Sequence, residues 1–492
     1  MDLYTSSSEA KNKHSLVTRS TDTTTEVRKL LNSGDPKNRI DVVFMGDGYQ
    51  LSEKEKFFSD VDYLVKKLFE GVTFSSYFPI YNVWAVYVES KDSGITRANI
   101  KKDTAFSLYR PGEELRAIYY PDETVNIINN YCKLTGEFAC DYKVVIANDE
   151  YYGGVGGDII ISTSSKRSGS VVLNHEMGHT FADVGDEYDN SYAYYGANSE
   201  EVKNFNEVKW KHWLTNSTNL REERNINRLL LYPWYNLKNG TFKANFTSDG
   251  NYNRWYYRIG ISGAKEENSI SIKIDDVIIP WKSADTIDRV FYDYFNGASG
   301  FSKGLHTLSI TSNTKIPENG PLRMVTSVTL HEYGTEEEYK FDGENYSLYP
   351  TWDDHNIKRY RPTNEYCVMR NVTSPRFCKV CKESLWLQYL KRLNIIDELI
   401  VSKKCGKVNV KLIPLQFAQF RKQPELFKGE KFIVKWFKDN VQVKEFDNLF
   451  ELNLKNKDSK YSGNWAVKVQ LITPEIKKDD NNLLFSEKKF II

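Results

Sequence analysis

The sequence lacks any apolar run long enough to cross a membrane, and it carries almost no net charge. A transmembrane helix needs about 20 apolar residues in a row, so no transmembrane segment is predicted. The 67 basic and 66 acidic residues leave a net charge of +1. This balance gives no indication of binding to nucleic acid or to an anionic membrane. Internal repeats and low-complexity tracts are also missing.

The polar N-terminus lacks the apolar core of a signal peptide. Two interpretations stay open: a cytosolic protein, or a mature form whose signal has been removed. Cysteine is scarce, with six in the chain and none before Cys132. A thiolate latch from the N-terminal lead-in is therefore excluded, and the even count permits disulfides without proving them.

The chain has 492 residues, which is too many for one core and predicts two to four domains. An α/β layer with a mostly parallel sheet is indicated by apolar strands alternating with a helix, at 39–50, 52–71, 83–90, 142–149 and 158–163. Strands with alternating polarity, separated by Gly, Asn and Ser turns, predict two β-sandwiches further along the chain. The Gly-rich stretch 151–158 is interpreted as a flexible rim or an edge-strand turn.

The chemistry is concentrated in "LNHEMGHTFADVGDEYDN", which runs from Leu173 to Asn190. On a helix over 168–184, His175 and His179 share one face and can bind one metal ion. Glu176 is placed to hold and deprotonate a bound water. This is the His-Glu-x-x-His arrangement of zinc peptidases. A chance match on a surface helix is the competing interpretation.

A catalytic zinc ion also needs a third protein ligand. On a continuous helix Asp186 would lie about 16 Å along the axis from His175, so the chain must bend, and Gly185 supplies the flexibility. The bend can deliver either Asp186 or Glu187 to the ion. Asp186 is the preferred ligand because it comes directly after the bend, and Glu187 is then a supporting residue. A ligand from a later helix stays open as an alternative, at Glu200, Glu201 or Glu207.

"HEMGHTFADVGDEYD", together with "VVFMGDGY" upstream, resembles the IgA peptidase-like zinc metallopeptidases, a family related to the metzincins. The resemblance covers roughly 38–190 and resumes near 345–395. It implies a zincin-like α/β catalytic domain, with a mostly parallel sheet and an active-site helix. The alternating strands described above then predict a β-sandwich inserted into this domain and an Ig-like β-sandwich after it. The expected domains are a loose lead-in at 1–35, the zinc-helix part at 36–234, the inserted sandwich at 235–335, the methionine-turn part at 336–398 and the C-terminal sandwich at 399–492.

The resemblance also implies a methionine turn in "EYCVMRN" at 365–371, with Met369 as a hydrophobic floor below the zinc. A core methionine is the plainer interpretation. The usual third ligand of metzincins would fall on Gly185, one residue before Asp186. Tyr188 is expected either to stabilise the oxyanion or to pack.

The remaining cysteines allow several interpretations. Cys378 and Cys381, together with Cys367, could form a second metal site, a redox pair or disulfides. No fourth ligand is obvious, so a disulfide that holds the methionine turn is favoured. Cys132 and Cys140 are expected to close a short loop as a disulfide.

The resulting prediction is a secreted or cell-surface zinc endopeptidase, acting as a monomer with Zn²⁺ as cofactor. Glu176 is the catalytic base, and the metal ligands are His175, His179 and Asp186. The resemblance implies protein or glycoprotein substrates, such as host immunoglobulins. The rival from another class is a catalytically silent glycan- or protein-binding module on a metallopeptidase scaffold.

Overall fold

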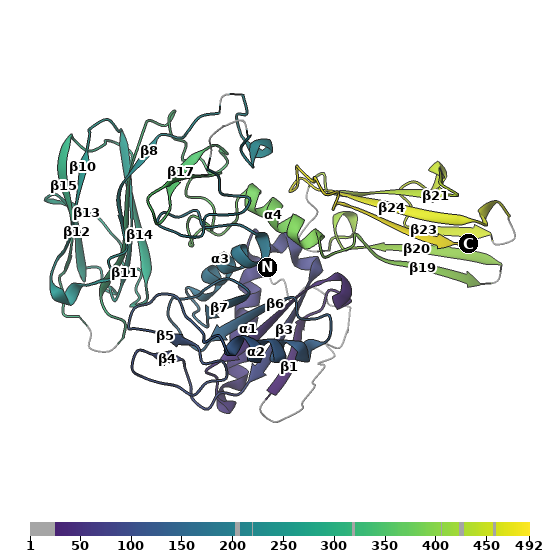
Figure 1. Ribbon diagram of the computed structural model, residues 1–492, viewed down its shortest axis with the longest axis horizontal. Coiled ribbons are helices and arrows are strands. Elements are labelled where there is room, and N and C mark those ends of the chain that lie inside the picture. Colours follow the sequence, from purple (N-terminus) through teal and green to yellow (C-terminus); the bar gives the residue numbers. More distant parts are fainter. Residues whose placement is uncertain are drawn as a thin grey trace.

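The computed structural model describes residues 25–201, 207–218, 220–316, 320–404, 406–422, 428–455 and 459–492. Figure 1 shows an α/β part in the middle, a β-sandwich on one side and a smaller pair of sheets on the other. Strands in several sheets make up most of the regular structure, and helices are few. In the described part of the chain, no helix is both long and apolar enough to span a bilayer.

The α/β part is built on a five-stranded sheet with the order β1-β3-β2-β6-β7. The inner strands β2 (Ile40–Asp47) and β3 (Tyr81–Val88) are buried along their whole length. They pair in parallel, as do β2 with β6 (Tyr142–Ala147) and β6 with β7 (Ile159–Thr163). Both faces of such a sheet must be covered, which explains the continuous apolar sequences.

Helices cover the two faces of this sheet unequally. Helices α1 (Lys54–Glu70) and α3 (Gly169–Ala182) pack on one face, in a core shared with Phe44 of β2. Helix α2 (Thr124–Cys132) packs on the other face. The predicted disulfide between Cys132 and Cys140 is confirmed at the end of α2.

Residues 25–31 do not belong to a loose lead-in, contrary to the prediction for 1–35. They form β1 (Thr25–Leu31), which pairs antiparallel with β3 at the edge of the sheet. Val27 is buried opposite Val86, and Arg28 forms an ion pair with Glu55 of α1 at 2.6 Å. The few apolar residues of this polar segment, Val27, Leu30 and Leu31, all pack against the cores of the α/β part. The composition of the segment alone does not reveal these contacts. The preceding residues of the predicted lead-in lie outside the described residues.

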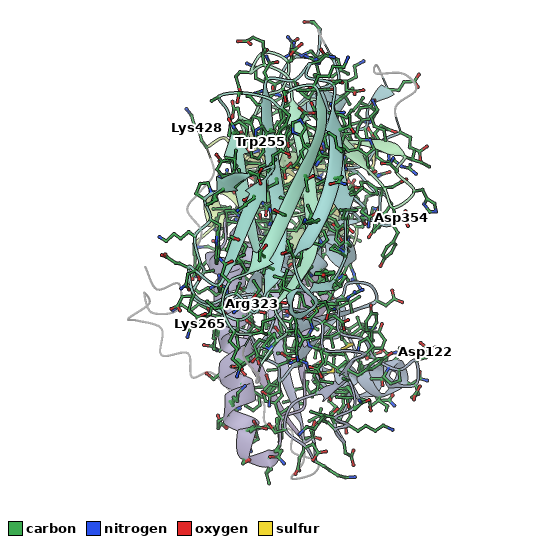
Figure 2. All side chains as sticks on the ribbon, turned by 90° about the vertical axis from the view of Figure 1, so that its left-hand side faces the viewer. Asp122, Trp255, Lys265, Arg323, Asp354 and Lys428 are labelled. Atoms are coloured by element: carbon green, nitrogen blue, oxygen red, sulfur yellow. A yellow bond between two sulfur atoms is a disulfide. The ribbon has the colours of Figure 1, made fainter. Side chains whose placement is uncertain are left out.

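Two antiparallel sheets follow, with the orders β10-β15-β12-β13 and β14-β11-β16-β8, and they enclose a separate apolar core. Figure 2 shows these strands in front view, with Trp255 labelled on them. The inserted sandwich begins earlier than the predicted boundary at 235. Strand β8 precedes that boundary and belongs to the sandwich, because it pairs with β16. The strands are β8 (Asn225–Leu231), β9 (Tyr235–Asn236), β10 (Phe242–Ser248), β11 (Arg254–Ser262), β12 (Ile270–Ile274), β13 (Val277–Ile279), β14 (Val290–Asn296), β15 (Gly304–Ser312) and β16 (Met324–Tyr333).

The chain then returns to the α/β part. A hairpin of β17 (Tyr349–Trp352) and β18 (Lys358–Arg361) leads to α4 (Lys379–Leu390), which packs against α3.

The C-terminal sheets have the orders β19-β20-β23 and β22-β21-β24-β25. Their core is continuous with that of the α/β part, through Trp386 of α4 against Phe417. These strands are β19 (Ile396–Lys404), β20 (Lys407–Pro414), β21 (Lys431–Lys438), β22 (Val441–Gln442), β23 (Glu451–Lys455), β24 (Asn464–Ile472) and β25 (Phe485–Ile491). A short pair, β4 (Thr96–Arg97) and β5 (Tyr109–Arg110), lies between β3 and α2.

Candidate active site

Helix α3 is held close to its neighbours by two glycines. A Cβ on Gly169 would lie 2.4 Å from the Thr163 carbonyl oxygen, so the helix begins directly against β7. A Cβ on Gly178 would lie 2.5 Å from the sulfur of Met369. The helix is therefore fixed between the sheet and the segment around Met369.

The two histidines of α3 are oriented by backbone carbonyls. The His175 Nδ1 lies 3.0 Å from the Val368 carbonyl oxygen, and the His179 Nδ1 lies 3.0 Å from that of Val184. A carbonyl can only accept a hydrogen bond, so each Nδ1 carries the proton. Each Nε2 is then the ring nitrogen left to bind a metal ion once it gives up any proton, which is the tautomer that a metal-binding histidine uses.

Asp186 is brought back to the helix by a bend that begins at Asp183. Asp183 adopts a left-handed conformation with φ 51°, which ends α3 after Ala182. Gly185 does not make this bend, contrary to the sequence prediction. It is required because a Cβ there would lie 2.3 Å from the Ala193 carbonyl oxygen. The Asp186 N–H donates to that same carbonyl at 2.8 Å, which fixes the returning segment.

Three ligand atoms converge at the end of this segment. The Asp186 Oδ1 lies 3.1 Å from the Nε2 atoms of both His175 and His179. The Ser191 hydroxyl donates to the other carboxylate oxygen, Oδ2, at 2.5 Å. Among the described residues, no Glu, Asp, Cys or further His joins this group within 4.8 Å. Glu200, Glu201 and Glu207 therefore lie outside it.

Glu187 points away from the histidines, although it follows Asp186 directly. Its Oε1 accepts a hydrogen bond from the Asn198 side chain at 2.8 Å and lies 3.7 Å from the Cys381 sulfur. The three cysteines expected to include a disulfide are free thiols, so that prediction is wrong. The Cys378 and Cys381 sulfurs lie 3.5 Å apart, too far for a bond of about 2.05 Å.

Tyr188 and Met369 lie on different sides of His175. The Tyr188 ring centroid lies 6.0 Å from that of His175, and its side chain lines the cavity in front of the helix. Met369 is fully buried behind the helix, and its carbonyl accepts a hydrogen bond from the Glu187 N–H at 2.9 Å. The Met369 sulfur faces Gly178 of α3, the helix that carries both histidines.

Glu176 is enclosed by the Gly-rich stretch 151–158. Val155 exchanges two backbone hydrogen bonds with Ile161, so this stretch forms the edge of the sheet beside β7. A Cβ on Gly156 would lie 2.8 Å from a carboxylate oxygen of Glu176. The glycines therefore let the backbone pass close to Glu176, and the interpretation of this stretch as an edge-strand turn is confirmed.

The charges of the group favour a cation. Burial opposes protonation of His179, but the neighbouring Asp186 outweighs it and raises the pKa of His179 to about 9. Burial also opposes the charge on Asp186, yet both histidines hold the pKa of that carboxyl well below its usual range. Burial raises the pKa of Glu176. Two imidazole nitrogens and one carboxylate oxygen converge here, as in a catalytic Zn²⁺ site with three protein ligands. The residues therefore fit this metal.

Residues 28–225 match the family model described as IgA Peptidase M64. This match supports a relationship to the IgA peptidase-like metallopeptidases, and residues 28–225 are called the M64 segment below. No curated protein matches the chain. Among solved structures, the CBM51-2 and INT domains of Clostridium perfringens ZmpB are 10% identical, cover 57% of this chain and 81% of that one, and have a TM-score of 0.12. A β-glucosidase from Kluyveromyces marxianus is 9% identical, covers 51% and 44%, and has a TM-score of 0.14. Scores this low establish nothing about the fold.

The M64 segment forms only part of the cavities in front of α3. One cavity, of about 670 Å³, is open over the ligand group and is lined by residues of the M64 segment. A second, of about 320 Å³, also reaches His175 and Glu176, but Arg258 and Arg289 on its far side come from the inserted sandwich. The insertion therefore forms a wall of the site.

Some contributions to the candidate site could not have been found from the motif. The Val368 carbonyl is a backbone group and leaves no signal in a side-chain pattern. Ser191 lies five residues after Asp186, and nothing in its spacing distinguishes it from any other serine near a bend. The Gly-rich stretch did carry a signal, because glycine marks a close approach of the backbone.

Proposed function

We propose that the chain is a zinc-dependent endopeptidase with a zincin-like catalytic domain. The observation that carries the proposal is the convergence of the His175 Nε2, His179 Nε2 and Asp186 Oδ1 atoms beside Glu176, at the mouth of a cavity. His175, His179 and Asp186 would hold Zn²⁺. When bound there, the ion supplies Lewis acidity towards a carbonyl oxygen and lowers the pKa of water.

Glu176 is the general base in this proposal. Its carboxylate takes a proton from the attacking water and passes it to the nitrogen of the leaving amine. Burial raises the pKa of Glu176, which brings its basicity closer to the working pH. The approach of Gly156 to Glu176 limits the space around the carboxylate and holds it in position.

Tyr188 is proposed to donate a hydrogen bond from its hydroxyl to the oxygen that gains negative charge, and it keeps its proton. Its ring lies beside His175, on the cavity side of the helix. Proteins or glycoproteins, immunoglobulins among them, are the proposed substrates, and the proposed location is outside the cell or on its surface. The domain boundaries given above, adjusted for β1 and β8, belong to the same proposal.

The proposal is tested by mapping new termini in a denatured protein mixture that has been digested by wild type and by Glu176→Ala. Internal cleavages made by the wild type alone would establish endopeptidase chemistry. Zinc content is measured in parallel for wild type and His179→Ala. Zinc in neither protein, with identical digests, would leave the binding-module alternative.

A further inference from the structure

A second group of metal donors lies behind the proposed active site. It consists of the thiols of Cys367, Cys378 and Cys381 and the carboxylate of Glu187, and all four donor atoms lie within 4.8 Å of one another. Cys378 directly precedes α4, Cys381 lies in its first turn, and Cys367 lies two residues before Met369. Three separate parts of the chain thus bring their donors to one point.

The sulfur separations fit a shared ion better than a disulfide. Cys381 lies 3.7 Å from Cys367 and 3.5 Å from Cys378. A tetrahedral ion with metal–sulfur bonds of about 2.3 Å places its sulfurs about 3.8 Å apart, whereas a disulfide requires about 2.05 Å. The Glu187 Oε1 lies 3.7 Å from the Cys381 sulfur, close to the roughly 3.5 Å expected for a mixed sulfur and oxygen pair on zinc.

Burial makes this group costly without an ion. Cys367, Cys381 and Glu187 are fully buried and Cys378 is 5% exposed. The second oxygen of Glu187, Oε2, is buried with no hydrogen-bond partner among the described residues. A buried carboxylate lacking a cation or sufficient donors is strongly disfavoured. The Asn198 side chain holds Oε1 in place, as a supporting residue does for a metal ligand.

We propose that Cys367, Cys378, Cys381 and Glu187 bind a structural zinc ion, distinct from the one at the histidines. A site with four protein ligands and no open position is typical of a structural rather than a catalytic zinc ion. Binding displaces the thiol protons, because the thiolate is the ligand form. The ion would tie α4 to the segment that delivers Asp186 and to the turn that carries Met369.

The test uses the full chain after metal removal, with Co²⁺ as the probe. In His175→Ala/His179→Ala, which has lost the proposed catalytic ligands, Co²⁺ should still bind with thiolate-to-cobalt charge-transfer absorption in the near ultraviolet. Cys378→Ser/Cys381→Ser should lose that absorption. Glu187→Gln should keep it and bind the ion more weakly, by about 10-fold or more.

Zinc content supports the same comparison. The wild type should bind one ion more than either double variant. Absence of the charge-transfer band in the folded histidine variant would overturn the proposal, and so would a non-reducing mass showing a disulfide among the three cysteines. The histidine variant decides the question even where the cysteine variant fails to fold.

A different observation concerns the smaller cavity between the M64 segment and the inserted sandwich. Four arginines line it, and aromatic rings pack against three of them, Arg116, Arg258 and Arg289. The Arg289 guanidinium lies 5.0 Å from the Tyr152 ring and 4.8 Å from that of Trp234, and Arg116 lies 4.0 Å from the same Trp234. Arg258 lies 4.7 Å from the Phe291 ring.

Arg116, Arg258 and Arg289 have little negative charge to balance them. Among the residues that the structure describes, Arg289 and Arg116 form no ion pair, and Arg258 reaches Asp293 only at 3.5 Å. The acids Asp189 and Glu365 on the same cavity wall already share Arg370, at 2.7 Å and 3.0 Å. The positive charge is therefore available to a ligand.

We infer that this cavity binds a carboxylate of the substrate beside the bond to be cleaved. The cavity also reaches His175 and Glu176, and guanidinium groups are suited to pairing with carboxylates. The carboxylate could belong to an acidic side chain or to the C-terminus of the substrate. The link to cleavage rests on the proposed function, whereas carboxylate binding does not.

Binding of labelled peptides to Glu176→Gln tests this inference by fluorescence anisotropy. One peptide has an internal Glu and an amidated C-terminus, one is neutral with a free C-terminus, and one is neutral and amidated. At least one of the two carboxylate peptides should bind about 10-fold more tightly than the third, consistent with a charge-assisted pair. Which of the two binds identifies the source of the carboxylate.

Adding Arg258→Met/Arg289→Met should abolish the preference, whereas Arg224→Met, the same change outside the cavity, should keep it. Equal binding of all three peptides would overturn the inference. A carboxylate preference without cleavage by wild type would uphold the site and refute the peptidase.

Discussion

Asp186 and Glu187 are neighbours in the chain, yet their carboxylates serve two clusters of opposite character. Asp186 joins two imidazoles at the mouth of an open cavity. Glu187 joins three thiols that are almost completely buried. A hydrolytic metal site needs an open position for water and substrate, and a structural site does not. Accessibility to water and substrate, more than the number of donor atoms, therefore distinguishes the proposed catalytic site from the proposed structural one.

The cluster of His175, His179 and Asp186 is called the open cluster here. The largest expected effect of a substitution is on turnover at this cluster. Glu176→Gln keeps the size of the side chain but removes the base, so kcat/KM should fall by about 1,000-fold, within the range of general acid–base catalysis. Steady-state cleavage of a quenched peptide measures this loss. The zinc content should be unchanged. Full activity in this variant would mean that the open cluster is not the catalytic centre.

Paired substitutions of the neighbouring acids test the division directly. Asp186→Ala should lose the ion at the histidines, and its metal affinity there should fall by well over the roughly 10–100-fold typical of an outer residue. Glu187→Gln should keep that ion. Titration with a competing chelator measures both affinities. A larger loss of metal affinity in Glu187→Gln than in Asp186→Ala would assign Glu187 to the open cluster, and the two acids would then not serve separate clusters.

In the metal-free protein, the free energy of unfolding should depend on pH, because His179 of the open cluster can then be protonated. Asp186 raises the pKa of His179 to about 9, above the 6.5 of an unperturbed histidine. Protonated His179 therefore stabilises the metal-free fold, fully below pH 6.5 and progressively less as the pH rises to about 9. The loss is at most about 3 kcal/mol, at 1.36 kcal/mol per pKa unit.

Denaturant unfolding of chelator-treated protein at pH 6.5 and pH 9 measures this change in the free energy of unfolding. His179→Gln is the matched control and should show a smaller dependence on pH. Identical slopes in the two proteins would contradict the coupling between His179 and Asp186.

The smallest expected effect is at Ser191, which supports Asp186 without contacting the histidines. Ser191→Ala should weaken metal binding at the open cluster by about 10-fold. The band from the thiol cluster in the Co²⁺ spectrum should be unaffected. Ser462→Ala, an exposed serine of the C-terminal sheets, is the control. An equal loss at both clusters would show that Ser191 acts on the fold as a whole.

What the sequence predicted well was local. The spacing of His175 and His179 places both rings on one side of a helix whatever lies elsewhere, and the apolar strands specify the layer beneath it. Asp186 was also within reach of prediction, because it lies close to the helix. The role of the bend was assigned to Gly185 instead of Asp183, since glycine is the expected residue in a left-handed conformation.

What the sequence did not predict depends on contacts between distant segments. The sequence favours a disulfide over free thiols because Glu187, whose carboxylate joins the three thiols in the fold, lies far from them in the chain. Strand β1 was missed because its few apolar residues form no clear pattern without β3. Arg289 lies in a loop. It becomes part of a cavity only because the inserted sandwich packs beside the M64 segment.

The bond from His175 to the Val368 carbonyl spans 193 residues, and this has a consequence for biosynthesis. At about 5–20 residues per second, the ribosome needs on the order of 10–40 s to make the floor of the site after it has made the helix. During that time the inserted sandwich leaves the ribosome first. The order of synthesis therefore delays assembly of the candidate site until most of the chain has been made, so a nascent chain lacks part of the site that the proposed cleavage requires.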